Sequence, residues 1–298
     1  MSAPQAVLFD APGPRARRRI LIASVVAGLA VLALLVVAVL RLVERGQFDA
    51  EKWAPLVDPS TKEFPQVWGL LLDGLLVTLQ AAALAVVASL LIGVTLAAVR
   101  LSLGRAGRMP LVALMELLRG LPVVVTILYV YVVFLATGLD VEQFWALVVG
   151  LTLYNCVIIA EITRAGVQSL PKGQVEAGLA VGLTKSQVMR LIQLPQALRA
   201  MLPAIISQLV VILKDTALAI VVLNSVHDLM WHANKIRIFL DNPLQTYFVV
   251  AVIYILLNLV LDRLAHWTQR RLSRAGTEKV VDEANAPVEG EPRRSTTA

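Results

Sequence analysis

The sequence predicts an all-α membrane protein with six transmembrane helices. Of its 298 residues, 58% are hydrophobic and only 16% are charged, whereas soluble domains carry about a quarter charged residues. In addition, the chain contains six apolar runs that approach or exceed the roughly 20 residues needed to cross a bilayer core as a helix. These runs cover residues 20–40, 69–99, 117–139, 144–162, 202–223 and 245–265.

The first apolar run, 20–40, contains no charged residue. A cleaved signal peptide is the alternative interpretation, but signal peptides have apolar cores of about 7–15 residues followed by small residues at the cleavage site. This run is longer and is followed by Arg-Leu-Val-Glu-Arg-Gly. We therefore expect a retained N-terminal transmembrane helix at 20–43, ahead of a five-helix core at 69–265.

The basic residues predict the orientation of the helices, because Lys and Arg near helix ends are retained on the cytoplasmic side. The two tails and the two connections on their side of the membrane carry 19 Lys and Arg, whereas the opposite side carries 5. We therefore expect a multi-pass protein of the plasma membrane with both termini in the cytoplasm. This topology also accounts for the net charge of +6, and no water-exposed domain is large enough to suggest nucleic-acid binding.

The two tails have a composition typical of disorder. Residues 1–19 and 276–298 are rich in Pro, Glu and Arg and lack apolar periodicity, so they cannot bury enough apolar surface to fold alone. We expect both to be cytoplasmic tails without fixed structure. The single cysteine, Cys156, lies in an apolar run, which excludes an intrachain disulfide and leaves a packing role; we expect no metal site.

The third and fourth apolar runs each contain or precede helix-breaking residues. Gly120 and Pro122 predict a kink near the start of the third run, with Arg119 reaching to the lipid phosphates. After the fourth run, a proline and a glycine within 169–173 end the preceding helix.

The cytoplasmic segment 169–199 is too polar to span the membrane but is regularly patterned. We expect a short helix at 174–181, a turn at Gly182, and a second helix that Pro195 ends. Thr184, followed three residues later by Gln187, matches a capping box for the second helix. The apolar face of that helix comprises Val188, Leu191 and Ile192.

Two interpretations of this segment remain open from its pattern alone. It could lie flat on the bilayer, but interfacial helices usually oppose a large apolar face to a Lys- or Arg-rich one. The first helix instead has one acid, small residues and no basic residue. Packing into a groove of another protein is the interpretation that we favour.

Several motifs resemble those of one transporter family. Glu176-Ala177, Gly182 and Leu194-Pro195 resemble the EAA loop of the membrane subunits of binding-protein-dependent ATP-binding-cassette (ABC) importers. Four stretches in the expected order are similar to the polar amino acid permease branch of that family, and the resemblance covers about residues 69–271. It implies a type I, MetI-like permease core with an extra N-terminal helix. The four stretches are 74–102, 116–131, 161–178 and 194–219.

The resemblance also implies a set of partners. Such importers combine two membrane subunits with two ATPase subunits and an extracellular solute-binding protein, and transport follows ATP-driven alternating access. This chain lacks the GxxxxGK[ST] loop that cradles nucleotide phosphates. We therefore expect a transport subunit rather than an enzyme, without a cofactor of its own, and Mg-ATP on the partner ATPase. The residues implied in ATPase docking are Glu176, Ala177, Gly178, Gly182, Leu194 and Pro195.

The sequence departs from the family pattern at a few positions. Gly178 replaces the second alanine of the EAA motif, Leu121 replaces a threonine, and Ala217 replaces a serine. The helix at 20–43 is absent from five-span members but is similar to that of actinobacterial glutamate permeases. We therefore expect glutamate as substrate and a different chain as the second permease subunit. Glutamine or another polar amino acid, and a stand-alone secondary transporter, are the alternatives.

Ionisable and polar residues inside the spans are candidates for the substrate pathway, because an unpaired charge there costs several kcal/mol. Lys214 and Asp215 lie within the run 202–223, and Asn155 and Glu161 lie within 144–162. Lys214 could attract an acidic substrate. The alternative, which we weigh at least equally, is an ion pair that serves structure, for example with Glu161 or Glu116.

Overall fold

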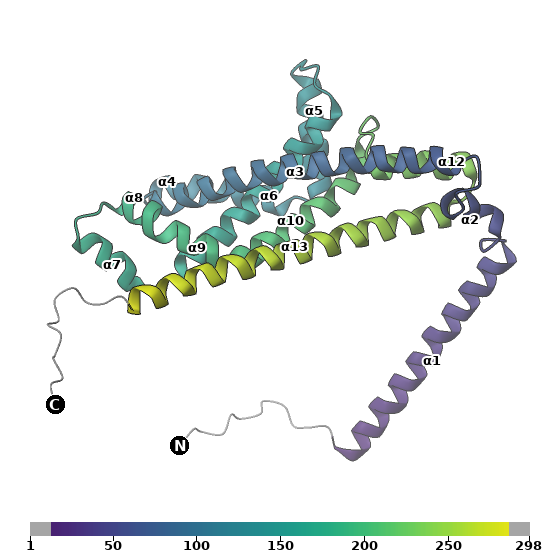
Figure 1. Ribbon diagram of the computed structural model, residues 1–298, viewed down its shortest axis with the longest axis horizontal. Helices are drawn as coiled ribbons and strands as arrows, with labels where there is room; N and C mark the ends of the chain where they lie inside the picture. Colours follow the sequence, from purple (N-terminus) through teal and green to yellow (C-terminus); the bar gives the residue numbers. More distant parts are fainter. Residues whose placement is uncertain (1–12, 286–298) are drawn as a thin grey trace, which may run out of the picture.

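The computed structural model of the chain describes residues 13–285, and these residues form helices without a strand (Figure 1). Five helices are long and apolar enough to cross a membrane, or six if one bent pair counts as a single span. The all-α class and the expected spans are thereby confirmed. The helices are α1 (Pro14–Glu44), α2 (Ala50–Val57), α3 (Phe64–Ser102), α4 (Arg105–Gly120), α5 (Val123–Ala136), α6 (Gln143–Gln168), α7 (Lys172–Ala180), α8 (Lys185–Gln187), α9 (Leu194–Ala200), α10 (Leu202–Asp215), α11 (Ala219–Val222), α12 (Leu229–Leu240) and α13 (Pro243–Asn285).

The centre of the core is α6, which packs along α3 and against α5. Small residues let the backbones approach closely, as is usual between membrane helices. A Cβ atom added to Gly93 of α3 would lie 2.6 Å from the carbonyl oxygen of Cys156, and one added to Gly150 of α6 would lie 2.7 Å from Cα of Ile127. Cys156 is buried in this contact, as its packing role requires.

The first helix, α1, extends away from the rest of the protein (Figure 1), and none of its residues is buried. It begins six residues earlier than the predicted run at 20, so residues 14–19 are helical rather than a tail without structure. Pro14 occupies the first turn, where its missing N–H is not needed, and the following arginines and alanine are good helix formers.

A polar junction joins the end of α1 to the start of α13. The backbone carbonyl of Gln47 accepts hydrogen bonds from the Trp53 indole and the Gln245 amide. Nearby, the Asn242 amide donates to the carbonyl of Lys52. The chain directly after α1 is therefore fixed to the core, whereas no residue of α1 itself is buried.

The third span is broken more strongly than predicted. Instead of a kink within 117–139, the chain bends by 108° between α4 and α5. Leu121 has an extended backbone, as expected for a residue before proline, and Pro122 precedes the first turn of α5. The two helices therefore point in separate directions.

The last helix, α13, contains the expected span 245–265 and continues to Asn285. The prediction of disorder from residue 276 is therefore wrong for 276–285. This stretch contains Glu, Lys and Ala, which favour helix, and no proline occurs before Pro287. The remainder of the predicted tails, 1–12 and 286–298, lies outside the described residues.

The fifth span is divided between α10, a 3₁₀ turn and α11, and it leads to a capped helix, α12. Asp228 is fully buried and its Oδ1 accepts the N–H of Trp231 at 2.9 Å, while Thr78 of α3 accepts the N–H of Leu229 at 3.0 Å. Burial raises the pKa of Asp228 to about 6, and burial together with nearby His227 lowers the pKa of His232. The hydrogen bond between Leu229 and Thr78 joins α12 to α3.

Candidate functional site

The EAA loop (169–199) begins with the predicted helix, turn and cap. The helix α7 is followed by Gly182 with φ of +87°, a conformation that favours glycine. The N–H of Gln187 then donates to the Thr184 hydroxyl at 3.3 Å, and the Gln187 side chain accepts the N–H of Thr184 at 2.8 Å. The capping box inferred from two residues is therefore present.

The second helix of the EAA loop does not end at Pro195, contrary to the prediction. After α8 the chain forms a π-helix at Val188–Gln193 and continues directly into α9. The N–H of Leu194 donates to the carbonyl of Met189, five residues back. In an α-helix the ring of Pro195 would clash with the carbonyl four residues earlier, and the wider π turn avoids this clash.

The helix α7 has an exposed outer face and an inner face that packs on the π-helix. Glu176 and Ala177 are exposed, whereas Gly178 is buried. A Cβ atom on Gly178 would lie 2.9 Å from side-chain atoms of both Val188 and Ile192. The glycine therefore lets α7 approach the π-helix closely. Beside it lies a hollow of about 430 Å³, which is lined by Gly173, Gln174, Ala177, Gly178, Val181 and Ile192.

The two remaining docking candidates lie on α9. Leu194 is half-buried and Pro195 is exposed. Neither lines the hollow beside α7. Both instead belong to the continuous connection from the EAA loop into α10, so their position suits a link between the loop and the membrane span.

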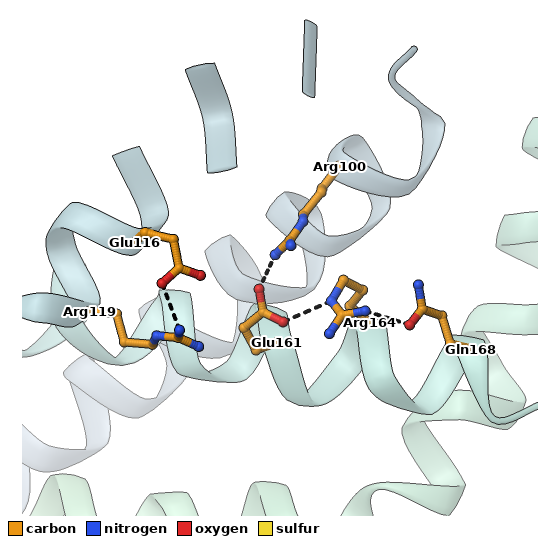
Figure 2. Close-up of polar contacts among 6 residues, drawn as sticks. All are labelled: Arg100, Glu116, Arg119, Glu161, Arg164 and Gln168. Carbon is orange, nitrogen blue, oxygen red and sulfur yellow. Dashed lines mark hydrogen bonds and ion pairs between the residues drawn. The ribbon is translucent and has the colours of Figure 1, made fainter. Parts of the chain in front are cut away.

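An ion-pair network joins α3 to α6 near the EAA loop (Figure 2). Glu161 of α6 accepts hydrogen bonds from Arg100 of α3 and, at 2.8 Å, from Arg164 one turn later. Arg164 in turn donates to Gln168, the last residue of α6. On α4, Arg119 pairs with Glu116 at 2.6 Å. Glu161 therefore ties α6 to α3, and α6 itself is separated from α7 by three residues.

Asn155 lies in the interior between α6 and α10. It is fully buried, donates to the carbonyl of Leu151 at 2.8 Å, and accepts a hydrogen bond from Gln208 of α10 at 2.7 Å. Gln208 is not among the residues predicted from the sequence, although an amide within the apolar run 202–223 is a usable signal. This hydrogen bond joins Asn155 to α10, the helix that carries the candidates Lys214 and Asp215.

Lys214 and Asp215 lie at the end of α10, exposed and half-buried respectively. Within the described residues neither forms an ion pair. The alternative of a pair with Glu161 or Glu116 is therefore wrong, because those two acids pair with arginines. Of the four pathway candidates, Asn155 is hydrogen-bonded to α10, the helix of Lys214 and Asp215, whereas Glu161 belongs to the ion-pair network between α3 and α6.

Across residues 13–285, no group of three or more His, Cys, Asp or Glu is placed to hold a metal ion. The arrangement offers a surface helix for a partner, connected through α6 and α9 to a polar interior.

Comparison with known proteins identifies relatives over most of the chain. Residues 64–274 match the family described as binding-protein-dependent transport system inner membrane component. The chain is 39% identical to the glutamate transport system permease protein GluD of Corynebacterium glutamicum, over 81% of this chain and 87% of that protein. It is 34% identical to the glutamine permease GlnP of Escherichia coli K12, over 68% and 93%, and 30% identical to the arginine permease ArtQ of Bacillus subtilis, over 70% and 94%.

Solved structures show the same fold. An amino acid ABC transporter crystallised with histidines aligns with a TM-score of 0.63 and 29% identity, over 70% of this chain and 96% of that chain. The MetNI methionine ABC transporter in an inward-facing form aligns with a TM-score of 0.55 and 19% identity, over 68% and 97%. The latter similarity concerns the fold alone and supports the MetI-like core.

Proposed function

The chain belongs to the binding-protein-dependent transport system inner membrane component family and is an amino acid permease of an ABC transporter, and on this premise we propose that its substrate is glutamate. Its relatives are transport subunits without catalytic activity of their own, so it is a permease and not an enzyme. A stand-alone secondary transporter is excluded by the same membership.

The extent of similarity supports glutamate. The alignment with the glutamate permease covers 81% of the chain, whereas the alignments with the arginine and glutamine permeases cover 70% and 68%. The longer alignment exceeds the family match at 64–274, so it includes sequence beyond the five-helix core. Glutamine and arginine permeases are nevertheless similar over the core, which makes another polar amino acid the second candidate.

We place the ATPase partner on the outer face of α7. Exposed Glu176 and Ala177, together with the hollow of about 430 Å³ beside them, form a surface into which another protein can pack. Two ATPase subunits would hold Mg-ATP, a second and different permease chain would complete the membrane part, and a solute-binding protein would deliver the amino acid from outside. The 19 to 5 asymmetry of basic residues supports cytoplasmic termini and a cytoplasmic EAA loop in the plasma membrane.

The connections of α7 provide a route for movement. At one end α7 follows α6 after three residues, and Glu161 ties α6 to α3 through Arg100. At the other end it continues through the π-helix and α9 into α10, which carries Gln208, Lys214 and Asp215. A displacement of α7 by the ATPase would therefore tilt α3, α6 and α10 and change access to the interior around Asn155.

Substrate identity is tested by ATP-dependent uptake in liposomes that contain the complete transporter. Labelled glutamate should accumulate and be displaced by unlabelled glutamate more effectively than by glutamine, aspartate or arginine. Competition by arginine alone would contradict the proposed substrate while leaving the permease assignment intact.

Docking is tested by Ala177→Arg, which places a long charged side chain at the hollow on α7. This variant should lose co-purification with the ATPase and lose uptake. Ala50→Arg, at an exposed position on α2, makes the same change at a distance from the EAA loop and should retain both. Equal behaviour of the two variants would show that α7 is not the docking helix.

A further inference from the structure

Two adjoining hollows form one groove along α3. The larger, of about 990 Å³, lies between the last turns of α3 and the EAA loop, and the smaller, of about 430 Å³, lies between α3, α9 and α10. Val94 and Thr95 line both hollows. We refer to the combined hollow as the α3 groove.

The α3 groove is apolar along the membrane-spanning helices. On α3 it is lined by Leu90, Leu91 and Val94, and opposite them by Leu198, Leu202 and Ile205. Within α3, Leu91 is 65% exposed. This surface requires an apolar occupant along its length.

The length of the α3 groove matches one leaflet of a bilayer. From Leu90 to Ser102, both of which line it, α3 advances by roughly 18 Å at the rise of an α-helix. A bilayer measures about 40–45 Å with its headgroups, so one leaflet occupies about half of that. The groove is therefore long enough for one lipid, from headgroup to acyl chain.

The α3 groove carries three basic residues. Lys185 and Arg190 line the larger hollow and Arg199 lines the smaller one, all three are exposed, and no acidic side chain is among the lining residues. Within the described part of the chain, none of the three has a hydrogen bond or ion pair through its side chain. Arg100, Arg119 and Arg164, by contrast, are all paired with acids.

The α3 groove is separate from the surface that we assign to the ATPase. Val175 and Leu179 of α7 line the groove, whereas Gln174, Ala177 and Val181 line the hollow on the other side of that helix. Residues four apart share a helix face, so the two sets face different directions. An occupant of the α3 groove would therefore contact the face of α7 that carries Val175 and Leu179, while the ATPase contacts the face that carries Gln174 and Ala177.

We propose that the α3 groove is a binding site for an anionic phospholipid. The acyl chain lies against Leu90, Leu91 and Ile205, and the phosphate lies at Arg190 and Arg199. Basic pockets between membrane helices are suited to anionic headgroups, and the unpaired arginines provide the charge that a neutral lipid would not need. Because the lipid touches both α3 and α7, its binding stabilises their relative position and raises ATP-dependent uptake.

Lipid binding is tested on the complete transporter in vesicles of phosphatidylcholine with spin-labelled phosphatidylglycerol. The fraction of immobilised label measures binding. Arg190→Gln combined with Arg199→Gln should weaken the preference for phosphatidylglycerol over phosphatidylcholine roughly thirtyfold, and the corresponding lysine variants should restore most of it. Arg105→Gln combined with Arg108→Gln removes the same charge from exposed positions on α4 outside the groove and should have no such effect.

A second variant tests the apolar part of the site. Val94→Trp fills the α3 groove without changing charge and should release the immobilised lipid. Inorganic phosphate should not compete, because it lacks the acyl chain. Any of three results would overturn the proposal. These are an equal loss of lipid preference in the arginine variants of the groove and of α4, retention of immobilised lipid by Val94→Trp, and cross-linking of position 94 to the second permease chain. Glutamate uptake in phosphatidylcholine alone tests the proposed substrate separately.

Discussion

The helices α1 and α6 are both membrane spans, but α1 has the higher hydropathy and α6 is the more buried of the two. The most apolar window of α1 has a mean hydropathy of 3.1 and none of it is buried, whereas that of α6 has 1.9 and 67% is buried. In the membrane, therefore, the more apolar helix is the peripheral one. High hydropathy indicates contact with lipid, and moderate hydropathy indicates contact with other helices.

The physical reason is that lipid cannot satisfy polar groups whereas neighbouring helices can. On α6, Asn155 and Glu161 find partners on α10 and α3. Among the residues that the structure describes, the one ion pair of α1 joins Arg41 to Glu44, and both side chains are more than 60% exposed. The central helix can thus carry the polar residues that transport requires.

The largest expected effect concerns glycine at a helix contact. Gly93→Leu would force a side chain into the carbonyl of Cys156 and should destabilise the fold by about 4 kcal/mol, which is enough to lose most of the folded protein. Gly28→Leu on α1, where an added Cβ meets no atom within 4 Å, should be neutral. Thermal unfolding of the purified protein in detergent compares the two, and a similar loss in both would contradict the difference in packing.

The next effect concerns ion pairs. Glu161→Ala leaves Arg100 and Arg164 unpaired at positions where their side chains are 15% and 27% exposed. Since breaking a buried pair is strongly destabilising, we expect a loss of about 2–3 kcal/mol and at least tenfold slower uptake. Glu44→Ala on α1 removes an exposed pair and should change stability by less than about 0.5 kcal/mol. If uptake by the Glu161 variant stayed normal, the network would not transmit movement.

A smaller effect on stability is expected at α12, whose N-cap residue Asp228 is a buried acid. The pKa of Asp228 is about 6 rather than 3.8, so the folded state disfavours its charge. This penalty is complete above pH 6, decreases as pH falls, and is absent below pH 3.8. Asp228→Asn keeps the helix cap and should raise stability by about 1–2 kcal/mol at pH 7. The gain should shrink towards pH 4, and a gain that is independent of pH would contradict the assignment.

The smallest effect is expected on α1 itself. Replacing residues 20–40 with an unrelated apolar sequence of equal length preserves the topology and removes no buried contact. Stability and uptake should therefore change by less than about 0.5 kcal/mol and twofold, respectively. A lost association with the second permease chain would show instead that α1 packs against that chain.

Features that depend on neighbouring residues were predictable from the sequence. The turn at Gly182 and the cap between Thr184 and Gln187 are set within a few residues, and the six spans follow from length and hydropathy. The partners of Glu161 were not predictable, because Arg100 lies 61 residues away along the chain. The Asn155–Gln208 bond, 53 residues apart, depends on tertiary packing in the same way.

Two local errors have a different cause. Pro195 was expected to end a helix, but the π turn before it removes the steric conflict on which that expectation depends. Pro122 was expected to kink a span, but the direction of the following helix is set by the packing of α5 on α6. A proline indicates a break in regular hydrogen bonding, and the surrounding structure determines its size.

The π-helix at Val188–Gln193 has a consequence at the level of the gene. Loss of one codon from a regular α-helix rotates everything after it by about 100°, which in α6 would turn its polar residues towards lipid. Loss of one codon within the π-helix can be absorbed by conversion to an α-helix, but Pro195 would then press on the carbonyl four residues before it. The additional codon and the proline codon should therefore be gained or lost together during evolution.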